Sequence, residues 1–196
     1  MKRGDDPGEA LSRAVWEVLA RQGLERLTIR AVAAAAGCTT GLVMHRFPNR
    51  PALLRHARRL LHEVTGTRVA ALEATAGSPR AALRAVLHQG LALDEQRAAE
   101  SRVWLGFLAA AFTDDDLIAI HRTNNRDWRS RIERLTGDAA PDWPPARVRT
   151  AALALLSMVE GVAALAAADP AAYPPAVQEE MLDAGLAAFG LRTSTR

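Results

Sequence analysis

The chain has 196 residues and a formal net charge of +3; 49% of its residues are hydrophobic and 24% are charged. These values are ordinary for a globular protein and exclude wholesale disorder. Alanine and leucine supply 41 and 25 residues and isoleucine only 4, which predicts a helical protein and excludes a β-sandwich or barrel. The single cysteine, Cys38, excludes an internal disulfide and favours a reducing, cytoplasmic location.

Capping residues, glycines and prolines divide the chain into about nine helices and predict an all-α fold. The first three helices are expected over 7–22, 28–36 and 39–45, and form an N-terminal head. The others are expected near 50–75, 79–91, 104–112, 113–137, 146–168 and 175–189 and form a helical body.

Two helix starts carry specific capping signals. Thr28 is a predicted N-cap, with Leu27 and Val32 placed as a hydrophobic staple around it. Thr113 is expected to cap the helix whose first turn is acidic, residues 114–116, which matches the positive end of a helix dipole.

No membrane association is expected. The first six residues, Met1 to Asp6, lead into a segment interrupted by charges, which predicts no signal peptide. The longest apolar stretch, 151–168, approaches the length of a membrane span but carries Glu160 near its middle. We therefore expect a buried helix there rather than a transmembrane one.

The positive charge is concentrated in the first third of the chain. Residues 1–60 hold 11 basic and 5 acidic residues, whereas residues 61–196 have a net charge of −3. Seven arginines and no acidic residue lie between Arg26 and Arg59. This pattern predicts a head that binds a polyanion on a body with another role. Charge alone leaves open an ordinary solvated basic face.

The two short helices joined at Gly37 predict a helix-turn-helix, with its second helix entering the DNA major groove. Gly41 lets the backbone approach the bases, and backbone N–H groups at the starts of the helices at Thr28 and Arg50 can bind phosphates. An ordinary helical hairpin with incidental arginines is the alternative. The expected DNA-contacting residues are Thr28, Arg30, Thr39, Thr40, Gly41, His45, Arg46 and Arg50.

The stretch from Leu27 to Leu54 resembles the DNA-binding head of TetR-family transcriptional regulators. The match includes the Ala-Gly turn, the glycine of the second helix, a Phe, a basic residue and a Leu-Leu pair. Met44 stands where the family usually has a phosphate-contacting Tyr, so no Tyr contact is assigned there. Arg46 replaces the usual His or Tyr, and His45 and Arg46 are candidates for phosphate contacts instead.

The body resembles the C-terminal domain of the choline/betaine-type repressors of that family. The similarity rests on 102–112, on 116–122 with the Trp-Arg pair at 128–129, and on 156–162, where Glu160 replaces the usual Asp. It does not identify an effector.

A ligand pocket is expected in the body. His121, Asn124 and Trp128 lie on one helical stripe, and buried polar groups of this kind need partners such as a ligand or water. A carboxylate beside aromatic faces would suit a cation, whereas a closed core is the plain alternative. The expected ligand-binding residues are Trp104, Phe107, His121, Asn124, Trp128, Met158 and Glu160.

Enzymatic chemistry is not expected. None of the five histidines forms an H-E-x-x-H pair, and no P-loop or nucleophile elbow occurs. The acidic run at 114–116 is explained by the helix start rather than by a metal. We therefore expect no catalytic residues, no cofactor and no metal.

These observations predict a DNA-binding domain over 1–50 and a ligand-binding and dimerisation domain over 51–196. The predicted function is transcriptional repression. Two copies of the chain are expected to bind double-stranded, palindromic operator DNA, and an unknown small-molecule effector is expected to release them from it. The homodimer is expected to form through the last two helices. The final helix offers Val177, Met181, Leu182, Gly185 and Phe189 to it. A helical ligand- or protein-binding module without sequence-specific DNA binding is the alternative.

Overall fold

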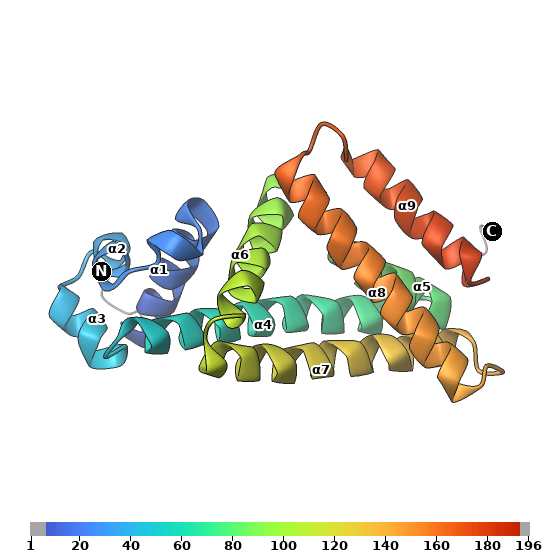
Figure 1. Ribbon diagram of the computed structural model, residues 1–196, viewed down its shortest axis with the longest axis horizontal. Helices are drawn as coiled ribbons and strands as arrows, with labels where there is room; N and C mark the ends of the chain where they lie inside the picture. Colours follow the sequence, from blue (N-terminus) through green and yellow to red (C-terminus); the bar gives the residue numbers. More distant parts are fainter. Residues whose placement is uncertain (1–6, 193–196) are drawn as a thin grey trace. The chain divides into compact units, whose positions relative to one another are not determined.

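The computed structural model describes residues 7–192, which form nine α-helices, a short 3-10 helix and no strand (Figure 1). The expected all-α fold is confirmed for this part of the chain; Met1 to Asp6, part of the signal-peptide prediction, lie outside it. The helices are α1 (Pro7–Gln22), η1 (Leu24–Arg26), α2 (Ile29–Ala36), α3 (Thr40–Arg46), α4 (Arg50–Thr75), α5 (Pro79–Gln89), α6 (Glu95–Ala111), α7 (Asp115–Ala139), α8 (Pro145–Ala168) and α9 (Pro175–Ala188).

The start of α7 differs from the prediction that Thr113 caps it. The Asp114 carboxylate accepts the hydrogen bond from the Leu117 N–H at 3.0 Å, so Asp114 is the capping residue. The Thr113 hydroxyl instead donates to the Ala110 carbonyl at 3.2 Å and satisfies the end of the preceding helix. A carboxylate is also the better cap electrostatically, because it lies at the positive end of the helix dipole.

The chain forms two compact units, and each is described by itself. The head unit contains residues 7–64 and 102–121, and the body unit contains residues 65–101 and 122–192. The helices α4, α6 and α7 therefore each contribute residues to both units.

The head unit has its own apolar core. Leu19, Leu27 and Leu53 are fully buried there, together with Val103 and Phe107 from α6. At Gly106 of α6, an added Cβ would lie 3.1 Å from the Cβ of Leu24. The glycine therefore allows α6 to pack closely on η1.

The core of the body unit lies among α5, α8, α9 and the later part of α7. Leu83, Leu155 and Ile132 are fully buried in it. The helices α8 and α9 pack side by side (Figure 1). A Cβ at Gly185 would lie 2.6 Å from Cε of Met158, so the glycine allows this close approach.

Among residues 7–192, α8 alone is long and apolar enough to span a membrane by length and composition. Eight of its residues are nevertheless buried inside the protein. A helix in the core of a globular unit satisfies the same length and composition test, and the burial agrees with the expected buried helix.

The prediction that Leu182 and Gly185 of the last helix lie on a dimer face is wrong. Leu182 is 1% exposed and belongs to the body core, and Gly185 packs against Met158 of the same chain. The physical reason is that α9 needs its most apolar face to cover α5 and α8. The side of α9 that remains exposed carries Ala176, Glu180, Ala184 and Ala188.

Candidate nucleic-acid interface and ligand-binding residues

The turn between α2 and α3 is built from capping interactions that the sequence indicates. The Thr28 hydroxyl accepts from the Ala31 N–H at 3.1 Å, and the Thr39 hydroxyl accepts from the Leu42 N–H at 3.3 Å. Between them Gly37 adopts the left-handed conformation with φ of 61°, which ends α2. These interactions fix α2 and α3 as the two helices of a helix-turn-helix.

All of the predicted DNA-contacting residues lie on the exposed surface of the head unit. The buried residues of the same motif, Val32, Val43 and Phe47, point into the head core instead. The exposed residues are Thr28, Arg30, Thr39, Thr40, Gly41, His45, Arg46 and Arg50.

The arginines of this surface have no acidic partners within residues 7–192. Arg30, Arg46 and Arg50 form no ion pair there, and the Arg46 guanidinium lies 5.9 Å from the centre of the Phe47 ring. In the body unit, by contrast, Arg84 pairs with Asp183 at 2.7 Å. Unpaired guanidinium groups are available to phosphate, whereas a paired arginine must first give up its carboxylate.

A buried histidine ties α4 to α1 beneath this surface. His56 is 7% exposed, and its ring lies 4.8 Å from that of Phe47. The Arg59 guanidinium, which can only donate, contacts Nδ1 at 3.1 Å, so Nδ1 is the acceptor and Nε2 carries the proton. Nε2 then donates to the Ser12 hydroxyl at 3.0 Å, and that hydroxyl donates to the Gly8 carbonyl at 2.9 Å.

This arrangement suits only a neutral imidazole. Burial, together with the positive charges of Arg59 and Arg46, lowers the pKa of His56 from 6.5 to about 4. This group is not predictable from the sequence, because Ser12 and His56 are 44 residues apart and no local pattern joins them.

A second connection inside the head unit comes from α7. The Arg55 guanidinium pairs with the Asp116 carboxylate at 3.0 Å. Asp116 therefore has a specific partner in addition to its place in the acidic first turn. Sequence spacing gave no sign of this pair either.

The predicted ligand-binding residues are divided between the units. Trp104, Phe107 and His121 lie in the head unit, where the Trp104 and His121 rings are 6.5 Å apart and Phe107 is 3% exposed. Burial and the nearby Arg58 lower the pKa of His121 below its usual value of 6.5, which favours a neutral imidazole.

The remaining predicted ligand residues lie in the body unit. Trp128 and Met158 are partly buried against the body core. Asn124 and Glu160 are also partly buried, and within residues 7–192 the Asn124 side chain makes no hydrogen bond. Whether the seven residues contact one ligand stays a prediction.

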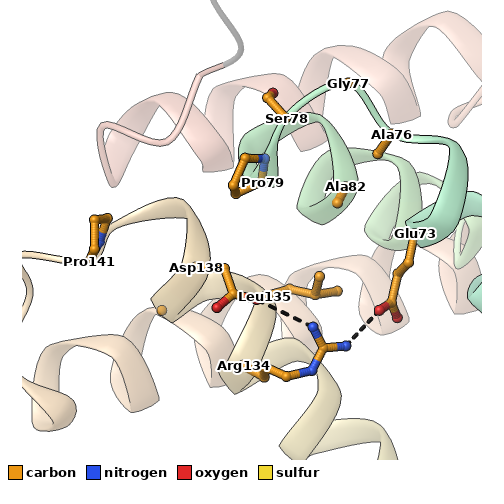
Figure 2. A pocket seen from close by; sticks show the side chains of 11 residues that line it. Glu73, Ala76, Gly77, Ser78, Pro79, Ala82, Arg134, Leu135, Asp138 and Pro141 are labelled. Carbon is orange, nitrogen blue, oxygen red and sulfur yellow. Dashed lines mark hydrogen bonds and ion pairs between the residues drawn. The ribbon is translucent and has the colours of Figure 1, made fainter.

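The body unit contains a pocket of about 700 Å³ that none of these seven residues lines (Figure 2). Its walls come from the end of α4, the start of α5 and the end of α7. Figure 2 shows Arg134 between Glu73 and Asp138. Its guanidinium lies 2.6 Å from the Glu73 carboxylate and 3.3 Å from that of Asp138. Because Glu73, Arg134 and Asp138 are already ion-paired within the chain, this pocket offers no unpaired charge to a ligand.

No metal centre is formed in the part of the chain that the structure describes. Within residues 7–192 no group of three or more His, Cys, Asp or Glu side chains is arranged to hold a metal ion. Within the acidic run, Asp114 caps α7 and Asp116 pairs with Arg55 instead.

Two family matches cover most of the chain. Residues 12–57 match the family described as "Bacterial regulatory proteins, tetR family". Residues 79–190 match the family described as "BetI-type transcriptional repressor, C-terminal". The first range contains the helix-turn-helix, and the second contains most of the body unit.

Curated relatives and solved structures agree with these matches. The HTH-type transcriptional regulator BetI of Stenotrophomonas maltophilia is 30% identical over 164 residues, which are 82% of each chain. A transcriptional regulator from Rhodococcus sp. Rha1 is 32% identical with a TM-score of 0.82, covering 94% of this chain and 96% of that one. A regulator from Saccharomonospora viridis, solved in complex with choline, shares the fold with a TM-score of 0.82 at 16% identity over 91% of this chain and 94% of its own. The chain therefore belongs to the TetR family of helix-turn-helix transcriptional regulators, with a C-terminal part of the BetI type.

Proposed function

We propose that two copies of this chain bind a palindromic operator through the exposed surface of α2 and α3 and repress transcription. The observation that carries the proposal is that Arg30, Arg46 and Arg50 lie exposed on α2, α3 and α4 and form no ion pair within residues 7–192. Neutralising DNA phosphates releases counterions, so these arginines supply affinity that depends on salt but not on sequence.

Arginine and threonine variants separate affinity from specificity. We expect Arg46→Ala or Arg50→Ala to weaken binding to all duplexes alike, and to reduce the slope of log affinity against log salt by about 2 for a dimer. Arg126→Ala, an exposed arginine of the body unit, is the matched control. Thr40→Ala should instead change which sequences are selected from random duplexes. Unchanged affinity, slope and selection in all three head variants would contradict this assignment.

We propose further that the operator-binding species is a homodimer formed through α8 and α9. Support comes from the stripe of α8 residues that is exposed in a single copy of the chain. This stripe carries no charged residue over 150–168. Its members are Thr150, Leu153, Ala154, Ser157, Gly161, Leu165 and Ala168. Small and apolar side chains at this spacing let a second helix pack closely, and a two-fold dimer matches a palindromic site.

Charge inserted into this stripe tests the dimer. Leu153 and Leu165 are 37% and 51% exposed, so their replacement by Glu should leave the fold of one chain intact. We expect sedimentation of the double variant to give a monomer that binds a full operator at least tenfold more weakly. Phe112→Glu, at a 78% exposed position in the head unit, is the control. A wild type that is monomeric at micromolar concentration would contradict the proposal.

For the effector we propose a small apolar or cationic molecule that binds the body unit at Asn124, Trp128, Met158 and Glu160 and lowers operator affinity. An aromatic face and a carboxylate favour a quaternary ammonium ion, and Trp128 and Glu160 of the body unit carry these groups. A protein of the same fold is known in complex with choline. The coupling needs the effector to bind the DNA-free form more tightly than the DNA-bound form.

Choline and its uncharged analogue, in which carbon replaces the ammonium nitrogen, test the effector class. We expect choline to release the wild type from operator DNA and the uncharged analogue to act more weakly. Trp128→Ala and Glu160→Gln should retain DNA binding and lose the response. If both compounds leave binding unchanged while unfolding shows Trp128→Ala to be destabilised by about 3–5 kcal/mol, these residues are core only.

The cytoplasm is the proposed location, where operator DNA is found.

A further inference from the structure

The α3 helix exposes two large apolar side chains on the surface proposed to face DNA. Met44 is 52% exposed and Leu42 is 37% exposed, whereas Val43 between them is completely buried. Exposed apolar side chains of this size are infrequent in residues 7–192, where only four others occur. Two of them on one seven-residue helix therefore require an explanation beyond the fold of the chain.

The glycine at the start of α3 is also unexplained by packing within the chain. A Cβ at Gly41 would meet only the Thr39 hydroxyl, at 3.8 Å, which is an ordinary contact. Glycine is also a weaker helix former than alanine, so its value at this position lies outside the folded chain. Without a side chain at Gly41 the backbone of α3 can lie deeper in a groove.

Helix geometry then decides where the neighbouring side chains point. Successive residues are turned by about 100°, so Met44 lies on the same side of α3 as Thr40, one turn before it. Leu42 lies on the opposite flank, with Arg46. On the Arg46 flank, the guanidinium forms no ion pair within residues 7–192 and is suited to phosphate, which leaves the Thr40 and Met44 flank for base edges.

The major groove offers one prominent apolar group, the C5-methyl of thymine. A methionine side chain is long, flexible and polarizable and can follow such a methyl group. It has no hydroxyl and cannot donate a hydrogen bond to a phosphate oxygen. We propose that Met44 packs on a thymine C5-methyl and makes α3 select thymine at one position of each half-site. This inference rests on the proposed DNA-binding function.

Replacement of single thymines by deoxyuridine tests this contact, because only the methyl group is removed. The duplex is the sequence that the wild type selects, and each thymine is exchanged symmetrically in both half-sites. One buried methyl group corresponds to about a fourfold change in affinity, so we expect about a fifteenfold loss at one symmetric position. Exchanges in the flanking sequence serve as the control.

The variants identify which side chain reads the methyl group. Met44→Ala should bind the thymine and deoxyuridine duplexes equally, and Met44→Leu should keep part of the discrimination. Leu42→Ala should retain it. Because Met44 is exposed, circular dichroism should show Met44→Ala to be folded like the wild type.

Three results would overturn the inference. Wild-type binding that is insensitive to every deoxyuridine exchange would leave DNA binding established but remove the methyl contact. Discrimination that persists in Met44→Ala and disappears in Thr40→Ala or Leu42→Ala would assign the contact to another residue. Failure of the wild type to select any sequence would remove the proposed function together with this inference.

Discussion

Acid should destabilise the head unit through His56 in particular. Its pKa is about 4 in the native protein, against 6.5 for an ordinary histidine. The native state therefore favours the neutral ring, so its contribution to stability is complete well above pH 6.5. As the pH falls below 6.5 the unfolded chain binds a proton that the native state does not, and the contribution is lost until the pH reaches about 4.

The size of the effect follows from the separation of the two pKa values. Each pH unit between them corresponds to about 1.4 kcal/mol, and pH 5 lies 1.5 units below the unfolded value of 6.5. The free energy of unfolding should therefore fall by about 2 kcal/mol between pH 7 and pH 5 because of this residue alone. Carboxylates and His121, whose pKa is also lowered, add their own dependence.

A comparison with His56→Gln isolates the contribution. Glutamine can keep hydrogen bonds to Ser12 and Arg59 but does not titrate, so the variant should lose about 2 kcal/mol less than the wild type between pH 7 and pH 5. Urea unfolding followed by circular dichroism at one protein concentration measures both values. His45→Gln, at an exposed position of α3, controls for removal of a histidine as such. Equal pH dependence in the wild type and His56→Gln would refute this account of the buried ring.

Three further changes test other parts of the structure. Gln178→Leu should lower the free energy of unfolding by about 2–4 kcal/mol, measured by urea titration, because the buried amide satisfies three backbone groups of its surroundings. Gly37→Ala should cost about 1 kcal/mol from left-handed strain alone, since an added Cβ meets nothing within 4 Å; melting would then shift only slightly. Asp183→Asn should reduce the loss of stability below about pH 4, because the Arg84 hydrogen bond lowers the pKa of Asp183 and that stabilisation is lost as the carboxylate is protonated. An acid-unfolding profile identical to that of the wild type would contradict the last expectation.

The sequence predicts the helices well because their boundaries are set locally. Thr28 caps α2 as expected, and Gly37 ends it, since both effects depend on residues within one turn. The prediction that Thr113 caps α7 is wrong because two adjacent side chains, Thr113 and Asp114, can both cap a helix at this point. The Asp114 carboxylate is the one that does so. Exposure of the DNA-contacting set was also predictable, because polar residues in a short amphipathic helix face away from its core.

Contacts between distant segments were not predictable from one sequence. The Ser12, His56 and Arg59 network and the Arg55 pair with Asp116 join segments tens of residues apart. For the same reason Leu182 was placed on a dimer face, although its apolar character is equally suited to the core that it occupies. An apolar stripe specifies burial but not which surface covers it.

The contribution of α6 and α7 to the head unit limits how modular this regulator is. Val103, Phe107 and Leu117 form part of the same apolar core as α1 and the start of α4, and Gly106 is fitted to Leu24. A fragment that ends at residue 64 would lose these residues and expose the apolar surface that they cover. A chimeric regulator that receives the DNA-binding helices of another protein should therefore also receive the segment that corresponds to residues 102–121. Otherwise the side chains of residues 102–121 must be changed to fit the new DNA-binding helices.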